Sequence, residues 1–268
     1  MFRAFNLRIA DNPFDLAAVE GGRKHMAALR PGLRQRMRDS LRGDGSLDGE
    51  HLRRTRFPGV RCQVFISHSH RDVDAALGLA GWLASNLGVA AFVDSGVWGH
   101  ADELLAEIDD EHCRNNGRST YNYAKRNRST AHVHAMLSTA LASMMDETEC
   151  LIFMNTSSSV PLAGSIDETD SPWIFVEIEA ANRMRRRPVH EHRGIKLAKA
   201  RLDEGDLRIF HQLQLENLTE INVATLRDWQ AGARESDGTN PLDVLYGLAP
   251  CGGDLSPIQK LRALLPRG

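Results

Sequence analysis

The chain has 268 residues, of which 42% are hydrophobic and 25% charged, as is ordinary for a globular protein. Its formal net charge of −2 argues against binding nucleic acid through overall positive charge, so we expect no nucleic-acid partner. The four cysteines are far apart in the sequence, which speaks against a zinc finger or a disulfide framework. There is no long apolar stretch and no signal-peptide pattern, so we expect a cytoplasmic protein without a membrane span.

Residues 1–59 contain more Lys and Arg than Asp and Glu. A weak helical pattern runs from about residue 27 to 41, and three glycines then loosen the chain: Gly43, Gly45 and Gly49. The sequence therefore predicts an N-terminal basic helical extension and linker over 1–59. Such a segment is more often a solvated helix than a docking surface for an anionic partner.

The folded core is predicted to begin near Val60. Residues 63–67 form a short apolar run, which is typical of a buried parallel strand. Asp72 can cap the helix that follows, because apolar residues then recur at helical spacing over 73–87. Gly88 is expected to end that helix.

A second buried strand is predicted over 89–93, directly before Asp94. Together with the first strand and helix it makes a β-α-β unit, whose two strands are parallel. After a loop, a helix is expected over 101–113. Residues 114–130 are polar and irregular, and we interpret them as an insertion.

The next predicted elements are a helix over 132–145 and a buried strand over 149–155. The pair Ser171-Pro172 is typical of a helix start, and the helix is expected to end near the basic residues 185–187.

The remainder of the chain has a weaker pattern. It indicates strands over 209–215 and 220–223 and a helix over 225–232. The tail, 236–268, is predicted to be loop with one amphipathic segment, 257–265.

Strands alternate with helices over 60–235, which predicts an α/β domain with a central parallel sheet flanked by helices. In such sheets, ligands bind beyond the carboxyl ends of the strands. That edge is expected to hold residues 68–71, 94–100 and 155–159. The candidate functional residues of the sequence therefore fall at one rim of the sheet.

Two histidines follow the first strand in the stretch VFISHSHRD. Residues i and i+2 of a strand share a face, so His68 and His70 could form a chelating pair. The strand has ended at that point, however, and no carboxylate or Cys lies at ligand spacing, so we expect no metal site. A structural turn and the lining of a pocket both stay open as interpretations.

Other motifs give weaker indications. Asp94 stands at a strand end like a phosphoacceptor, but the accompanying acidic cluster and Lys are missing. The basic run 118–128 contains Tyr121 and Tyr123 and could stack on nucleotides, although a solvated insertion is more common. Neither a dinucleotide motif nor a P-loop is present. A Ser-His-Asp triad stays open, although no G-x-S-x-G motif marks a nucleophile.

The stretch SPWIFVEIEAA places Trp173 and Glu177 on one face of a helix start. We expect the helix N-terminus to lower the pKa of Glu177 and keep it ionised. Glu177 is either a surface residue or the carboxylate of a site. The second interpretation gains weight because this helix start reaches the same rim as His70.

Four segments, in this order, resemble parts of TIR (Toll/interleukin-1 receptor) domains. VFISHSHRD resembles their first strand and loop, and VAAFVDSGVWGHADELLAEI their second strand, mobile BB loop and next helix. ECLIFMNTSSS resembles their third strand, and SPWIFVEIEAA is similar to their S-x-W-x-x-x-E-[IL] motif. The resemblance covers roughly residues 60–232 and implies a flavodoxin-like TIR fold. The insertion, the leader and the tail depart from the family pattern.

Many bacterial TIR domains cleave or cyclise NAD⁺, and the resemblance implies such an activity here, in anti-phage immune signalling. In those enzymes the Glu of the motif is the catalytic carboxylate, which implies that role for Glu177. The substrate-binding residues implied in the same way are Trp173, Ser69, His70, Asp94 and Trp98. No metal or other cofactor is implied, because NAD⁺ is the substrate.

The resemblance also implies partners. These are NAD⁺, further copies of the chain through TIR–TIR contacts, and an upstream sensor or a downstream effector. The alternative is a non-catalytic TIR scaffold that signals by protein–protein assembly. In a scaffold Glu177 would be a solvated surface residue, whereas in an enzyme it would line a site.

Overall fold

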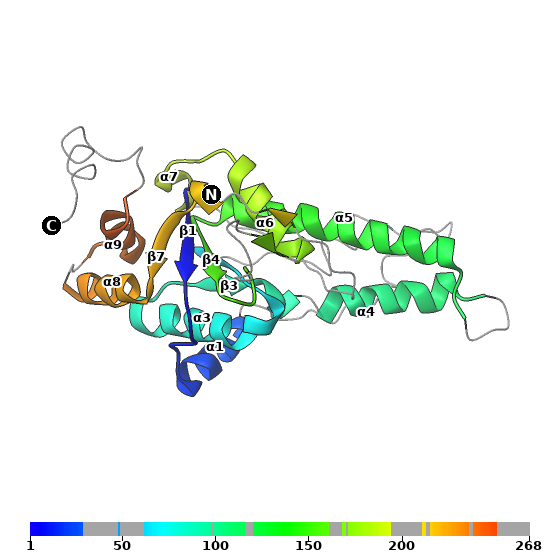
Figure 1. Ribbon diagram of the computed structural model, residues 1–268, viewed down its shortest axis with the longest axis horizontal. Coiled ribbons are helices and arrows are strands. Elements are labelled where there is room, and N and C mark those ends of the chain that lie inside the picture. Colours follow the sequence, from blue (N-terminus) through cyan, green and yellow to red (C-terminus); the bar gives the residue numbers. More distant parts are fainter. Residues whose placement is uncertain are drawn as a thin grey trace.

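The computed structural model describes residues 1–28, 48, 62–97, 99–115, 120–160, 168–169, 171–193, 211–212, 215–235 and 238–250. These residues form an α/β protein in which a five-stranded parallel sheet is flanked by helices (Figure 1). The architecture is consistent with a flavodoxin-like fold. The predicted fold class and the predicted central parallel sheet are therefore confirmed.

The strands of the central sheet are β1 (Arg3–Arg8), β2 (Val64–Ser67), β3 (Ala91–Val93), β4 (Cys150–Asn155) and β7 (Thr219–Asn222). A second, antiparallel sheet consists of β5 (Glu168–Thr169) and β6 (His211–Gln212). The α-helices are α1 (Leu16–Ala28), α3 (Val73–Leu87), α4 (Gly99–Ile108), α5 (Tyr123–Glu147), α6 (Pro172–Arg183), α7 (Val189–His192), α8 (Val223–Glu235) and α9 (Pro241–Leu248). Short turns of 3-10 or π helix are η2 (His70–Asp72), η3 (Asp94–Val97), η4 (Asp109–Cys113) and η5 (Leu215–Asn217).

The strand order of the central sheet is β3-β2-β4-β1-β7. A flavodoxin-like sheet has the order 2-1-3-4-5 along the chain. The strands from β2 to β4 follow that order, but β1, the first strand, occupies the fourth place. Arg3 pairs with Cys150 of β4, and Phe5 pairs with Thr219 of β7. The prediction that residues 1–59 are an extension outside the core is therefore wrong for β1.

Two polar side chains of β1 are buried, which is unusual for a central strand. Arg3 is 2% exposed and Asn6 3% exposed. The guanidinium group of Arg3 donates to the backbone carbonyls of Tyr246 at 3.3 Å and Ala249 at 2.5 Å. It also donates to Oγ1 of Thr219 at 3.3 Å. These hydrogen bonds offset the loss of hydration of a buried charge, and they link β1 to the end of α9.

Helix α1 also belongs to the core, because it packs against α3 (Figure 1). Glycines allow the two backbones to come close. A Cβ atom on Gly22 would overlap the carbonyl group of Leu77, and one on Gly81 would overlap that of Ala18. Only the start of the helix predicted over 27–41 coincides with α1, and the rest of it lies outside the described residues.

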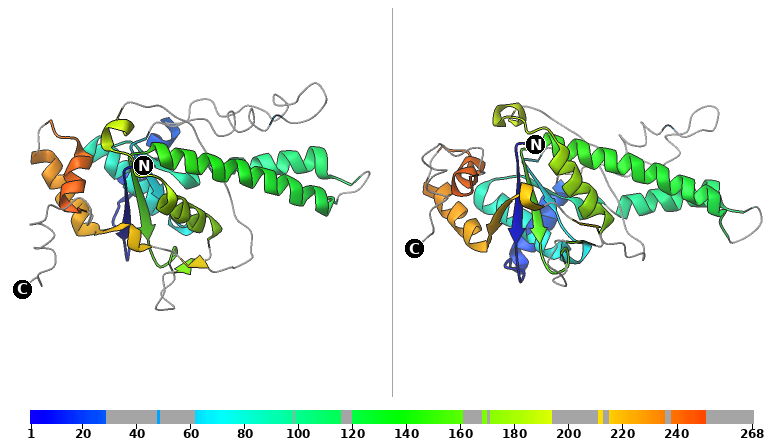
Figure 2. Two further views of the ribbon diagram at one scale, coloured as in Figure 1. Left: turned by 90° about the horizontal axis from the view of Figure 1, so that it is seen from above. Right: turned by 45° about the horizontal axis from the view of Figure 1, so that its top comes forward.

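Helices cover both faces of the central sheet. The residues of β2 and β3 are all buried, and in β4 only Asn155 is partly exposed. Strands that are buried on both faces are expected when helices lie on either side of a parallel sheet. Figure 2 shows the pair α1 and α3 on one side and the pair α5 and α6 on the other.

Helices α4 and α5 form an antiparallel hairpin that projects from the body of the molecule (Figures 1 and 2). Helix α5 has 25 residues, which corresponds to a length of about 37 Å. An isolated bridge between Arg114 and Tyr121 closes the tip. The irregular insertion predicted over 114–130 is therefore wrong for its second half, because α5 begins at Tyr123 and not at residue 132.

The C-terminal helices pack beside the edge strand β7. Trp229 of α8 is completely buried and meets Trp82 of α3 edge-on, with 6.0 Å between the ring centroids. Its indole N–H donates to the backbone carbonyl of Pro241 at 2.7 Å. The sequence predicts loop from residue 236, but the structure has α9 there. The amphipathic segment predicted over 257–265 lies outside the described residues.

Predicted helix ends agree with the structure in two cases out of three. Gly88 follows α3 with φ of 62°, the left-handed conformation that favours glycine, so it ends the helix as predicted. Ser171 caps α6 as predicted, since its Oγ accepts from the N–H of Ile174 at 3.3 Å. Asp72 is different, because its side chain makes no capping bond to α3. Its carboxylate accepts a hydrogen bond from Oγ1 of Thr156 at 2.6 Å.

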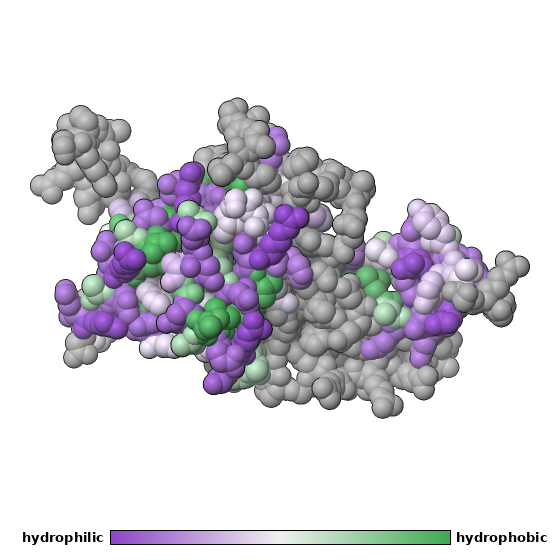
Figure 3. Space-filling view, turned by 60° about the horizontal axis from the view of Figure 1, so that its bottom comes forward, coloured by the Kyte–Doolittle hydropathy of each residue, from purple (hydrophilic) through white to green (hydrophobic). Residues whose placement is uncertain are grey.

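In the part of the chain that the structure describes, no helix is long and apolar enough to cross a membrane. The face that carries α1 is mostly hydrophilic and shows isolated apolar areas where it is coloured (Figure 3). Leu16, at the start of α1, is 87% exposed, and Tyr123, at the start of α5, is 79% exposed. Single exposed apolar side chains of this kind are common on folded proteins.

Candidate functional site

Four polar side chains meet at the carboxyl edge of the sheet, and we call them the buried polar cluster. Ser67 and Asp94 are 0% exposed, and His68 and Glu177 are 1% exposed. Ser67 is the last residue of β2, His68 follows it, and Asp94 follows β3 directly. β3 and β4 lie on opposite sides of β2, so the strand order reverses here, and such a switch point is where ligands bind in these sheets.

Glu177 enters the cluster from α6. The capping bond of Ser171 and the fixed φ of Pro172 start this helix at a defined residue. Glu177 then lies on the inner face of α6 with Trp173 and Ile178. Its Oε2 accepts a hydrogen bond of 2.5 Å from Oγ of Ser67. Helix α6 is thereby joined to the end of β2.

His68 and Asp94 form the second contact of the cluster. Nδ1 of His68 lies 2.5 Å from Oδ1 of Asp94, and both side chains are buried. The carboxylate of Asp94 also accepts from the backbone N–H of Ser95 at 2.7 Å. These contacts fix the ends of β2 and β3 relative to each other.

The pKa of Glu177 is raised well above its ordinary value. The largest cause is burial, and the negative charge of Asp94 is the next. The hydrogen bond from Ser67 and the nearby His68 only partly oppose the shift. Burial and Asp94 therefore favour the protonated form of Glu177. The expectation that the helix N-terminus lowers this pKa is wrong, because burial and Asp94 raise it.

The pKa of His68 is lowered to about 4, mainly by burial. Electrostatic interactions with the carboxyl groups of Glu177 and Asp72 oppose this shift without cancelling it. The imidazole is therefore neutral at neutral pH. The neutral ring carries one proton, and its Nδ1 lies against the carboxylate of Asp94.

Ser69 and His70 lie beside the cluster. Ser69 is 8% exposed, and its Oγ accepts from the N–H of Arg71 at 3.4 Å, so it caps η2. His70 is the first residue of η2 and is exposed to solvent. The structure therefore brings His68, and not His70, into the buried polar cluster.

Trp173 lies close to the cluster, one turn before Glu177 on α6. It is 7% exposed, and its ring meets that of His134 from α5 edge-on, with 5.3 Å between the centroids. Among the described residues, Nε1 of Trp173 has no hydrogen-bond partner. A buried donor without an acceptor is costly, so a ligand that accepts this hydrogen bond would be stabilised. Trp98 lies outside the described residues.

The cluster combines two carboxyl groups, one imidazole and one hydroxyl group. It does not have the arrangement of a Ser-His-Asp triad, because Ser67 donates its hydroxyl hydrogen to Glu177 and not to an imidazole. Across the described residues, no group of three or more His, Cys, Asp and Glu side chains is placed to hold a metal ion. The carboxyl groups can accept hydrogen bonds from sugar hydroxyls and can stabilise a positive charge.

Sequence reasoning misses one member of the cluster, Ser67, which it assigns only to a strand. It places His68 at the rim of the sheet but names His70 as the substrate-binding residue. A signal for both was present: an apolar strand that ends in Ser-His places these side chains directly at the carboxyl edge of the sheet.

The fold and the site define an α/β protein with a buried acidic cluster at the carboxyl edge of its parallel sheet. No family model, curated protein or solved structure matches the chain. The function must therefore be inferred from the chemistry of the cluster.

Proposed function

We propose that the chain cleaves the bond between nicotinamide and ribose in NAD⁺, with Glu177 as the carboxylate that acts at the ribose. The position of Glu177 is the observation that supports this proposal. Its carboxyl group is 1% exposed and lies against Ser67 and Asp94 at the ligand-binding edge of the sheet. The resemblance to TIR domains assigns the catalytic role to the same residue.

The reaction needs few groups. When the bond between C1′ of the ribose and the ring nitrogen breaks, nicotinamide leaves as a neutral molecule with the bonding electrons. The positive charge passes to C1′ and the ring oxygen of the ribose. Water then adds to C1′ and releases a proton, which gives ADP-ribose, or another group of the same molecule adds and gives a cyclic product. A carboxylate beside C1′ stabilises the positively charged transition state.

The charge of Glu177 follows from what occupies the site. In the structure the pKa of Glu177 is raised because the carboxyl group is buried beside Asp94, and this favours its protonated form. The nicotinamide ring of NAD⁺ is a cation, and a cation beside two carboxyl groups favours the ionised form of both. We propose that substrate binding itself converts Glu177 to the reactive carboxylate.

Two further side chains support binding of the substrate. The buried N–H of Trp173 has no acceptor among the described residues, and a ribose or phosphate oxygen can accept from it. Asp94 can accept from a ribose hydroxyl group while it holds His68. In this proposal Ser67 orients Glu177 through their hydrogen bond.

The scaffold alternative expects a solvated Glu177. The burial of Glu177 in a cluster with Asp94 and Ser67 speaks against the simplest form of that alternative. A scaffold would also provide no ligand that accepts a hydrogen bond from the buried N–H of Trp173.

The test is an assay of NAD⁺ loss by the purified full-length chain, with products separated by chromatography. The assay is run in dilute solution and with a crowding polymer, because the resemblance implies that copies assemble. We expect nicotinamide to be released and Glu177→Gln to lower the rate by roughly a hundredfold or more. If the wild-type chain leaves NAD⁺ intact under both conditions, or if Glu177→Gln retains full activity, the proposal is wrong.

Glu179→Gln is the matched control. Glu179 lies on the same helix and pairs with Arg183, and its side chain is 16% exposed. The same chemical change there lies outside the buried polar cluster and should leave the rate within about twofold of the wild type. A loss of activity in both variants would point to damage to α6 and not to the chemistry of Glu177.

A further inference from the structure

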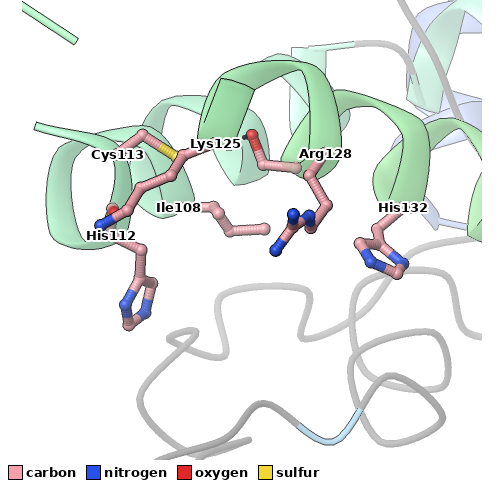
Figure 4. A pocket seen from close by; sticks show the side chains of 7 residues that line it. Ile108, His112, Cys113, Lys125, Arg128 and His132 are labelled. Carbon is pink, nitrogen blue, oxygen red and sulfur yellow. Dashed lines mark hydrogen bonds between the residues drawn. The ribbon is translucent and has the colours of Figure 1, made fainter. Parts of the chain in front are cut away.

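A cavity lies away from the buried polar cluster, in the α4–α5 hairpin between η4 and α5 (Figure 4). Its volume is about 380 Å³. Small-molecule sites in proteins begin at about 300 Å³. The cavity is therefore large enough for a ligand of the size of a small metabolite.

Basic side chains surround this cavity. Lys125, Arg128 and His132 come from α5, where their spacing of three and then four residues places them on one face. His112 comes from η4 on the other side. Figure 4 shows these side chains extending toward the same space. Nζ of Lys125 donates to the backbone carbonyl of His112 at 3.2 Å and keeps two further hydrogens for a ligand.

Among the lining residues that the structure describes there is no acidic side chain. Two of the three acidic residues of η4 bind other side chains. Asp109 pairs with Arg126 at 2.7 Å and accepts from Ser129. Asp110 pairs with Arg114 and accepts a hydrogen bond from the hydroxyl group of Tyr121 at the hairpin tip. Among the residues that the structure describes, Arg128 has no carboxylate partner.

The floor of the cavity differs from its rim. Ile108, Cys113 and Ser129 are buried there, while Lys125 and Arg128 at the rim are exposed. Sites for organic ligands commonly combine an apolar floor with a few polar groups that fix the orientation. A floor of this kind favours a ligand with an organic part over a bare inorganic ion.

We infer that this cavity binds the phosphate group of a small organic phosphate. Arg128 offers the planar set of N–H groups that suits two phosphate oxygens, and Lys125 adds a second positive charge. His112 and His132 add further nitrogen atoms at the rim. The organic part of the ligand lies against Ile108 and Cys113. This site stands apart from Glu177 and does not depend on the proposed NAD⁺ cleavage.

The test is calorimetric titration of the full-length chain with AMP, adenosine and inorganic phosphate. AMP is expected to bind more tightly than adenosine, which lacks the phosphate, and more tightly than inorganic phosphate, which lacks the organic part. Arg128→Gln and Lys125→Gln should each weaken AMP binding by about tenfold, the factor that one charge-assisted hydrogen bond represents. Equal affinity for AMP and adenosine would overturn the inference. Equal affinity for AMP and inorganic phosphate would overturn the claim that the organic part of the ligand binds to the floor of the cavity.

Two control variants locate the binding. Arg227→Gln changes an exposed Arg of α8 in the same way and should leave the affinity for AMP unchanged. Glu177→Gln should also leave it unchanged. If Glu177→Gln abolishes AMP binding while Arg128→Gln does not, AMP occupies the edge of the sheet. That result overturns the inference and leaves the proposed function standing.

Discussion

The hydroxyl group of Ser67 donates a hydrogen bond of 2.5 Å to Oε2 of Glu177, and this bond joins β2 to α6 across 110 positions of the sequence. The bond fixes one carboxyl oxygen of Glu177. The same carboxyl group also lies beside Asp94. The geometry explains how a carboxyl group can be buried and yet defined in its orientation. It also allows stability measurements to report on a site whose ligand has not been observed.

Glu177→Gln should make the protein more stable than the wild type at neutral and alkaline pH. The pKa of Glu177 is raised in the folded state, so the folded protein keeps a proton that the unfolded chain releases above about pH 4.5. The wild type therefore loses stability relative to the variant as the pH rises from that value. We expect a gap in Tm of several degrees at pH 8, measured by thermal unfolding across pH 5 to 9. Parallel curves for the two proteins would contradict the assigned charge state.

His68→Asn should make the protein less sensitive to acid. Burial lowers the pKa of His68 to about 4, whereas the unfolded chain takes up the proton near pH 6.5. The neutral, buried His68 thus stabilises the folded state above pH 6.5, and this stabilisation is lost as the pH falls toward 4. Its full size is about 3 kcal/mol. Denaturant unfolding at several pH values checks this, with His70→Asn, the exposed neighbour, as a control that should follow the wild type.

Phe5→Ala tests whether β1 is part of the core. Phe5 is completely buried between β4 and β7, so its truncation should destabilise the fold by about 3–5 kcal/mol. Leu16→Ala removes an apolar side chain that is 87% exposed and should change stability by less than about 0.5 kcal/mol. The midpoints of urea unfolding compare the two. Similar small effects would mean that residues 1–28 are dispensable.

Gly81→Ala tests the close approach of α1 and α3. Its Cβ would overlap the carbonyl of Ala18, so one of the helices must move, and we expect a loss of roughly 1–3 kcal/mol. Gly247→Ala in α9 meets open space and should be neutral or stabilising by up to about 1 kcal/mol, because Ala favours helix over Gly. Thermal unfolding distinguishes the two. A stabilising effect of Gly81→Ala would show that the two helices are not in close contact.

Much of the central sheet could be predicted because β2, β3 and β4 are buried on both faces. Such strands are short apolar runs, and their bounds were found within a few residues. β1 escaped detection because Arg3 and Asn6 interrupt its apolar pattern. The carbonyl group of Tyr246 that accepts from Arg3 lies 243 positions away in the sequence. No local pattern reveals a partner at that distance.

The candidate site could be predicted in part. Glu177 and Asp94 were both singled out, and the structure brings them together. The charge of Glu177 could not be predicted, because it depends on the burial of its carboxyl group beside Asp94, and a helix position alone gives neither. That His68 and not His70 joins the buried polar cluster could not be predicted for a similar reason. The sequence shows that both follow a strand, but not which of them turns toward the neighbouring strand end.

The place of β1 in the sheet has a consequence for synthesis on the ribosome. β1 is the first strand to be made, yet its neighbours β4 and β7 are translated much later. Until then its apolar residues, with Phe5 and Leu7 among them, have no strand to pair with. Contacts between distant parts of a sequence slow folding and leave surfaces open to aggregation. The nascent chain should therefore depend on chaperones until the C-terminal half has emerged.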